Sequence, residues 1–281
     1  MRLENTAALR STHGNIQQRT ESTRRNITGA GRNFGGTDND DGEHEAADMA
    51  FVAERGGGMR GNSGGGKKII EAAGMNSYKI IDEKNWARAA HCAIFRNCIE
   101  PNFCVTFEVD VTNFREKIRA KNLSFTLSMV YAVCRCGNEI ENFRYRFLDG
   151  AVVLFDKIDT AFTWLDAETE LFKVVNVPLL DNLESYVELA EKTANEQAEY
   201  FAAPLGNDIF QCSPLPWLTY THISHTNSGR KDNATPLFDW GKFRAADGKL
   251  LMPLSVQAHH SFVDGLHVGK FADRLQKFLD S

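Results

Sequence analysis

Two adjacent histidines near the C-terminus are the residues whose type and spacing best fit chemistry. They lie in Gln-Ala-His-His-Ser-Phe-Val-Asp-Gly, residues 257–265, in which His260 is the second of the pair and Asp264 follows four positions later. Histidine is the only side chain whose ordinary pKa lets it accept and return a proton near neutral pH. The segment therefore predicts a proton-transfer site, while Asp264 taken alone predicts a helix cap.

The elements on either side are expected to hold this segment rigidly. An apolar run at 250–256 predicts a strand, and apolar residues at helical spacing over 266–279 predict a helix. The histidines then lie where a strand ends, and Asp-Gly opens the next helix. At such a position an imidazole can be exposed to a cleft while rigid elements hold its backbone.

From residue 76 onward, the chain has the apolar periodicity of a folded domain. Helices are predicted at 112–121, 124–136 and 183–197, in addition to the one at 266–279. Strands are predicted at 104–111, 151–155, 160–165, 171–177, 209–211, 218–223, 236–244 and 249–258, with a hairpin turn at 246–248 between the last two. These elements predict an α/β (α+β) two-layer sandwich, in which helices cover one face of a mixed β-sheet.

Residues 1–75 differ from the rest of the chain in composition. They hold most of its glycines and almost no aromatic residues, and they lack sustained apolar periodicity. Such a segment cannot bury enough apolar surface to offset the entropy lost on ordering. We expect a low-complexity, disordered extension at 1–75 and one folded domain at 76–281.

Composition excludes several classes of partner. The 281 residues carry a formal net charge of -5, which gives no reason to expect nucleic-acid binding. No run approaches the 18 apolar residues typical of a membrane span, and the first 30 residues lack the apolar core of a secretory signal. The six cysteines are scattered, so we expect reduced thiols in a cytoplasmic protein.

Motifs along the chain repeat those of one acyltransferase family, in the same order. They are Trp-Ala-Arg-Ala-Ala-His at 86–91, Glu-Asn-Phe-Arg at 141–144 with Asp-Gly at 149–150, Phe-Thr at 162–163, Glu-Thr-Glu-Leu-Phe at 168–172, Ser-Pro-Leu-Pro-Trp at 213–217, and Leu-Met-Pro-Leu-Ser-Val-Gln-Ala-His-His at 251–260. Residues 76–281 thus resemble the chloramphenicol acetyltransferase family, which is trimeric, uses acetyl-CoA and belongs to the CoA-dependent acyltransferases. Residues 1–75 have no counterpart in it.

The resemblance implies roles for four residues. His260 would be the general base that takes the proton of the acceptor hydroxyl, a step worth ~10²–10⁴-fold in rate. Ser213 would donate a hydrogen bond to the oxyanion, worth ~10²–10³-fold. Asp264 would pair with Arg88 and hold the catalytic loop rather than take part in chemistry.

The resemblance also implies two pockets. An apolar acceptor pocket would include Phe95, Phe162 and Phe172, with Thr163 facing it, although Phe162 fits the hydrophobic core equally well. Trp217 would form a wall of the coenzyme A tunnel.

Three residues depart from the family pattern. Asp239 stands where the family has a threonine that organises the acceptor site, and His222 and His225 also replace other residues. A carboxylate at 239 would change the charge of the pocket and hence the choice of acceptor. These three side chains have the types of metal ligands, but we expect no metal.

The leading hypothesis is an acetyl-CoA-dependent O-acetyltransferase that acetylates chloramphenicol and so confers antibiotic resistance. It would act by direct transfer in a ternary complex, with no bound cofactor, as a homotrimer with sites between subunits. One alternative is the same chemistry on another small alcohol, and another is a non-catalytic CoA-binding homologue. Dihydrolipoyl acyltransferase cores share His-x-x-x-Asp-Gly and are expected to share the fold.

Overall fold

The computed structural model describes residues 76–202, 206–226, 230 and 232–281. The predicted extension at 1–75 lies outside these residues. The helices are α1 (Ala89–Arg96), α2 (Thr112–Ala120), α3 (Phe125–Asn138), α4 (Leu183–Glu196) and α5 (Gly265–Asp280), with a 3₁₀ helix at Glu141–Arg144. The strands are β1 (Tyr78–Ile80), β2 (Asn102–Asp110), β3 (Tyr145–Leu148), β4 (Ala151–Phe155), β5 (Asp159–Asp166), β6 (Leu171–Val177), β7 (Ile209–Leu215), β8 (Leu237–Gly241), β9 (Arg244–Ala246) and β10 (Lys249–His259).

The main sheet is mixed, as the sequence predicted. Its strands run in the order β2-β10-β8-β7-β5-β6, and β9 pairs with the start of β10. The β5–β7 and β7–β8 pairs are parallel, and the other pairs are antiparallel. A second, smaller sheet has the order β1-β4-β3. Strand β10 is the longest and lies between β2 and β8, so both edges of the strand that leads to His260 are held by hydrogen bonds.

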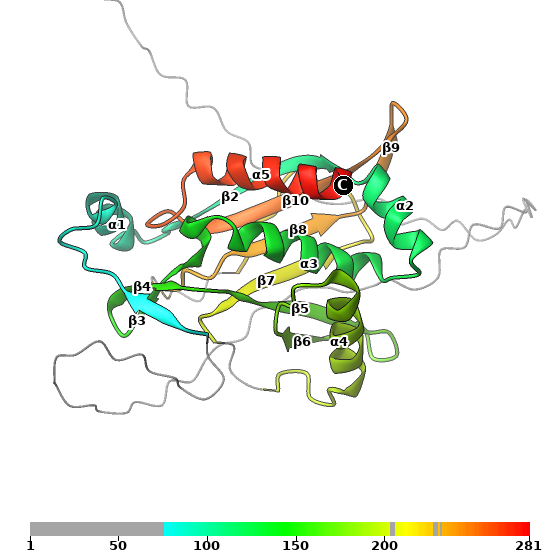
Figure 1. Ribbon diagram of the computed structural model, residues 1–281, viewed down its shortest axis with the longest axis horizontal. Coiled ribbons are helices and arrows are strands. Elements are labelled where there is room, and N and C mark those ends of the chain that lie inside the picture. The colour runs from blue at the N-terminus through cyan, green and yellow to red at the C-terminus, as the bar shows by residue number, and fades with distance from the viewer. Residues whose placement is uncertain (1–75, 203–205, 227–229, 231) are drawn as a thin grey trace, which may run out of the picture. The chain divides into compact units, whose positions relative to one another are not determined.

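Helices cover one face of the main sheet. Figure 1 shows α5 and α3 side by side across β10, β8 and β7, with α4 beyond α3 near β5 and β6. This arrangement confirms the predicted two-layer sandwich. The helices pack there because the strands present apolar side chains to them at alternate positions, for example Phe238 and Trp240 in β8.

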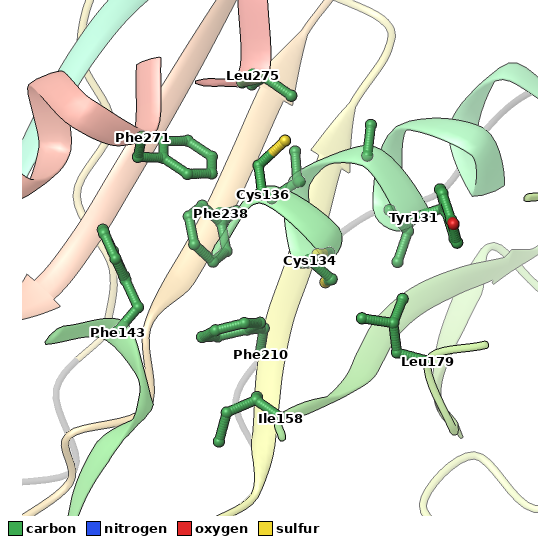
Figure 2. Close-up of a cluster of buried hydrophobic side chains, with 14 of the residues drawn as sticks. Tyr131, Cys134, Cys136, Phe143, Ile158, Leu179, Phe210, Phe238, Phe271 and Leu275 are labelled. Atoms are coloured by element: carbon green, nitrogen blue, oxygen red, sulfur yellow. Dashed lines mark hydrogen bonds between the residues drawn. The ribbon is translucent and has the colours of Figure 1, made fainter. Parts of the chain in front are cut away.

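The core between the layers is rich in aromatic rings. In Figure 2, Phe210 of β7 and Phe238 of β8 lie beneath Phe271 of α5 and beside Cys134 of α3. The ring centroid of Phe238 lies 5.5 Å from that of Phe210 and 5.1 Å from that of Phe271. Burial of these rings fixes the sheet beneath the helices and thereby fixes the position of each strand end.

The opposite face of the sheet carries small and polar side chains. The pairing register aligns Ser213 with Asp239, Asp239 with Ser255, and Ser255 with Thr106. The hydroxyl oxygens of Ser255 and Thr106 lie 2.7 Å apart. No helix of the described residues lies over this row, yet Ser213, Asp239 and Ser255 are buried.

Two strand predictions were wrong. Residues 218–223 form no strand, and the predicted strand 236–244 is interrupted between Gly241 and Arg244. The segment after β7 crosses over β8 instead of pairing with it, and the backbone N–H of Lys242 donates to the carbonyl of Leu218 at 2.8 Å. Gly241 permits the crossing, because a Cβ there would lie 2.7 Å from the Leu218 oxygen.

The hairpin turn before β10 is confirmed. Asp247 and Gly248 both have positive φ, 51° and 76°, and Ala246 pairs with Lys249. Two central residues with positive φ make the tight turn that matches the twist of antiparallel strands. Across 76–202, 206–226, 230 and 232–281, no helix combines the length and apolar character needed to cross a membrane.

Candidate active site

His260 lies one residue past the end of β10. Its backbone N–H donates to the carbonyl of Pro101 at 2.9 Å, which ties it to the residue before β2. Its imidazole stacks on Phe95 of α1, with centroids 3.9 Å apart and planes at 6°, and Phe103 of β2 lies at 4.7 Å. The side chain is 35% exposed. Two aromatic rings therefore fix the plane of an imidazole that still reaches the surface.

Arg88, just before α1, holds the segment that carries His260. Its Nη1 and Nη2 donate to the two carboxylate oxygens of Asp264, each at 2.6 Å. Its Nε donates to the carbonyl of Ser261 at 2.7 Å, and Nη2 also donates to the carbonyl of His260 at 3.0 Å. A planar guanidinium suits this task, since its donors have a fixed fork geometry. The structure thus brings Arg88 to His260 and Asp264, which lie more than 170 residues further along the chain.

Asp264 joins the arginine to the imidazole. The hydrogen bond from Arg88 lowers the pKa of Asp264 below its ordinary value of 3.8, so the carboxylate is ionised at neutral pH. Its Oδ1 lies 3.1 Å from Nδ1 of His260, which is close enough for electrostatic attraction but lacks the alignment of a hydrogen bond. The contact places negative charge beside an imidazole that would become positive on taking a proton.

His267 is a supporting residue that the sequence reasoning missed. Its Nδ1 accepts the backbone N–H of Asp264 at 2.8 Å, in the first turn of α5. Burial lowers its pKa, which favours the neutral ring that this contact requires. The spacing Asp-x-x-His is that of a capping box with histidine in place of glutamate, so the pattern was available in the sequence.

His259 has a different environment from that of its neighbour. It is 1% exposed, its Nδ1 accepts the backbone N–H of Ser261 at 3.1 Å, and its ring meets the edge of Phe147. Its burial and contacts fit packing rather than proton exchange with a substrate. We call Arg88, Phe95, His260, Asp264 and His267 the histidine cluster.

A cavity of about 370 Å³ lies on the polar face of the sheet. Its lining includes Ser213 of β7, Thr163 of β5, Gln257 of β10 and His225 of the segment that follows β7. The hydroxyls of Ser213 and Thr163 are buried and have no hydrogen-bond partner among the described residues. We call this region the serine cavity. Buried donors without partners are rare, because each costs ~1–3 kcal/mol, and here they suit a ligand.

The remaining predicted site residues have distinct locations. Phe162 borders the cavity, yet it is 1% exposed and belongs to the core. Phe172 contacts Phe201 and is not part of the cavity lining. Trp217 is 46% exposed in the turn after β7, also away from the lining. Asp239 is fully buried behind His225.

His260 and Ser213 of one chain do not meet. Ser213 aligns through Asp239 with Ser255, which lies two strands away and five residues before His260. With ~3.4 Å per residue along a strand and ~4.8 Å between strands, the two backbone positions are roughly 20 Å apart. His260 is not part of the cavity lining. A single chain therefore separates the imidazole from the hydroxyl.

A buried pair of His225 and Asp239 lies beside Ser213. Nε2 of His225 is 2.9 Å from Oδ2 of Asp239, and the two side chains are 5% and 0% exposed. The sequence analysis grouped both residues with His222 as side chains of metal-ligand type, but it did not predict their contact with each other. The third candidate ligand, His222, is exposed, and no group of three or more potential metal ligands occurs within the described ranges.

Comparisons with known proteins agree with this geometry. The chloramphenicol acetyltransferase family model matches residues 75–276. Chloramphenicol acetyltransferase 2 of Haemophilus influenzae is 30% identical over 210 residues, covering 73% of this chain and 98% of the relative. Chloramphenicol acetyltransferase 3 of Escherichia coli is 26% identical over 209 residues, with the same coverage of both chains.

Solved structures extend the likeness. A chloramphenicol acetyltransferase superposes with a TM-score of 0.67 at 31% identity, covering 72% of this chain and 99% of that one. A probable dihydrolipoamide acetyltransferase from Listeria monocytogenes has a TM-score of 0.52 at 16% identity, covering 68% and 89%, so it shares the fold alone. The match over most of the described chain shows that this chain belongs to the chloramphenicol acetyltransferase family and is an acyltransferase.

Proposed function

We propose that this protein transfers the acetyl group of acetyl-CoA to the hydroxyl of a small alcohol, with chloramphenicol as the first acceptor to test. The names of its relatives support acetyl transfer and that drug. The observation that carries the proposal is the restraint on His260: a stacked imidazole at the end of a strand, in a segment that Arg88 holds through four hydrogen bonds. Acetyl-CoA enters as a co-substrate, not as a bound cofactor.

In the proposed mechanism, neutral His260 takes the proton of the acceptor hydroxyl as its oxygen attacks the thioester carbon. The thioester oxygen becomes an oxyanion, to which the hydroxyl of Ser213 donates a hydrogen bond. The tetrahedral intermediate then collapses, and the C–S bond breaks. The imidazolium returns its proton to the departing thiolate, so free coenzyme A and an acetate ester leave together. Asp264, paired with Arg88, holds the segment that carries His260 in place.

We further propose that each site forms between two chains, in a trimer. The separation of roughly 20 Å between His260 and Ser213 supports this step, since one chain cannot bring the two groups to one thioester. A neighbouring copy would present its histidine cluster to the serine cavity. Trp217 and Phe172 would then reach coenzyme A or the acceptor at the contact between chains.

A complementation experiment tests the shared site. Chains carrying His260→Ala and chains carrying Ser213→Ala would be co-expressed with different tags and isolated through both tags. In a cyclic trimer holding both variants, about one site in three regains both residues, because one interface pairs an intact histidine with an intact serine. Recovery of roughly a third of wild-type activity is expected. Activity no higher than that of the separate variants would place both residues in one chain's site.

Release of thiol from acetyl-CoA in the presence of chloramphenicol tests the reaction itself. We expect acceptor-dependent release together with the acetylated drug. Acetyl-CoA binding without release, for chloramphenicol and for other alcohols, would instead support the non-catalytic homologue. Release with other alcohols alone would leave the reaction in place and reassign the acceptor.

A further inference from the structure

The His225–Asp239 pair lies at the base of the serine cavity. His225 belongs to the irregular segment that crosses the polar face after β7, and its side chain lines the cavity. Asp239 projects from β8, directly opposite Ser213 in the parallel ladder. It does not line the cavity itself. The carboxylate therefore acts on a ligand through its contact with His225 and through its electric field.

The contact between the two side chains suits one placement of the hydrogen. Nε2 of His225 lies 2.9 Å from Oδ2 of Asp239, and we assign the hydrogen to Nε2, because a carboxylate without a proton only accepts. In the neutral ring, Nδ1 then holds a lone pair. This nitrogen is buried and has no hydrogen-bond partner among the described residues. The lining of the cavity thus includes a side chain whose acceptor atom has no hydrogen-bond partner among the described residues.

Asp239 makes this part of the molecule electronegative. Burial, followed by the charge of Asp239, raises the pKa of the Cys104 thiol to about 11. Burial also raises the pKa of Tyr220, with Asp239 again adding to the shift. Cys104 lines the same cavity. A carboxylate whose field reaches these side chains also strengthens Nδ1 of His225 as an acceptor and favours a positively charged ligand.

We propose that His225, positioned by Asp239, selects the acceptor. It binds a hydrogen-bond donor located next to the reacting hydroxyl, and it prefers a protonated amine to a second hydroxyl. The substrate class is therefore small amino alcohols first, diols second and simple alcohols last. This inference rests on the proposed function for its link to turnover. Asp239 acts as a positioning residue, and His225 contacts the acceptor.

Three aromatic alcohols that differ in one group test the proposal: 2-amino-2-phenylethanol, 1-phenylethane-1,2-diol and 2-phenylethanol. Each has the same primary hydroxyl, and the neighbouring carbon carries an ammonium, a hydroxyl or hydrogen. Binding is measured by NMR titration without acetyl-CoA, and turnover by thiol release. A neutral hydrogen bond should favour the diol over the simple alcohol by ~2–10-fold, and a charged one should favour the amine by more than ~10-fold.

Two variants separate the hydrogen bond from the charge. His225→Leu should remove both preferences, so the three alcohols bind about equally. Asp239→Asn keeps an oxygen that can accept from Nε2 but removes the charge, so it should retain the preference for the diol and lose most of that for the amine. His222→Gln is the matched control, because His222 lines the same cavity but is exposed. It should keep the wild-type order.

The two readouts keep the inference distinct from the proposed function. Ranked binding, with no thiol release for these alcohols or for chloramphenicol, would support the acceptor preference and overturn the acetyl transfer. Thiol release that is equal for the three alcohols, and unchanged in His225→Leu, would overturn the preference and leave acetyl transfer in place. If the alcohols show no ranked binding and no thiol is released with them or with chloramphenicol, both proposals are overturned. An unfolded His225→Leu protein would shift the decision to Asp239→Asn, whose loss of the amine preference alone is the required result.

Discussion

The histidine cluster and the serine cavity differ in how their polar atoms are satisfied. In the cluster, Arg88 donates to a carboxylate and to two carbonyls, and His267 accepts the N–H of Asp264. In the cavity, Ser213, Thr163 and His225 each hold a buried polar atom without a hydrogen-bond partner among the described residues, whereas in the cluster Nδ1 of His260 alone does so, and it lies 3.1 Å from the Asp264 carboxylate. Hydrogen bonds within the protein fix the position of a side chain. Buried polar atoms without such bonds are suited to bind a ligand. The contrast supports the proposal that the cluster holds the base and that the cavity binds the ligand.

The largest effect is expected at His260, the proposed general base. His260→Ala should lower kcat by ~10²–10⁴-fold, because the acceptor hydroxyl loses its base. The dissociation constant of acetyl-CoA, measured by calorimetry, should change little, since the imidazole moves a proton and does not hold the nucleotide. His259→Gln is the control and should be milder. Equal losses in the two variants would remove the distinction between these neighbours.

Ser213→Ala should have the next largest effect, on the cavity side. Loss of the oxyanion donor should lower kcat by ~10²–10³-fold. The melting temperature should stay the same or rise, because the change removes a buried hydroxyl that has no partner among the described residues. A marked fall in melting temperature with normal kcat would assign Ser213 a structural role and contradict the ligand-binding character of the cavity.

Arg88→Ala should act on geometry and stability together. It leaves Asp264 without its partner, and the side chain of Asp264 is 34% exposed. We therefore expect a loss of about 2–3 kcal/mol in the free energy of unfolding, below the value for a fully buried pair, and about a 10-fold fall in kcat. Arg88→Lys should recover part of the stability through its charge, but little of the activity, because lysine lacks the fork.

The same pair predicts a pH dependence. Arg88 lowers the pKa of folded Asp264 below 3.8, so the stabilisation is present above that value and is lost as the pH falls through the lower folded pKa. The stability difference between wild type and Arg88→Ala should hold from neutral pH to about pH 4 and shrink in more acidic solution. Denaturant unfolding at a series of pH values measures it. A difference that grows on acidification would contradict the assignment of Asp264 as the ionised partner.

Deletion of residues 1–75 should have the smallest effect. The cut leaves Asn76, whose backbone and side chain donate to Asp208 and whose side chain also donates to Asp159. We expect kcat and the geometry of the histidine cluster and the serine cavity to be unaffected. The free energy of unfolding should change by less than about 1 kcal/mol. Calorimetric melting of the full and shortened chains measures this, and a larger loss would show that the segment packs on the domain.

Local pattern was sufficient for most elements. The predicted strands at 151–155 and 171–177 match β4 and β6 in full, and α5 begins within one residue of its predicted start. The strand prediction for residues 218–223 was wrong although their alternating, β-branched and aromatic composition is typical of a strand. Their backbone instead crosses β8 at Gly241. That crossing depends on a residue far along the chain, which no short window of sequence contains.

The sequence by itself determined that His260 follows a strand and precedes a helix, and that the chain has the residues for acyl transfer. Apolar periodicity, turn residues and sequence motifs are local properties, so they can be recognised in the sequence alone. The tertiary structure alone decided that His260 and Ser213 lie roughly 20 Å apart, and that His225 meets Asp239 at 2.9 Å. Strand register and the path of an irregular segment decide both, and each results from the packing of the whole sheet.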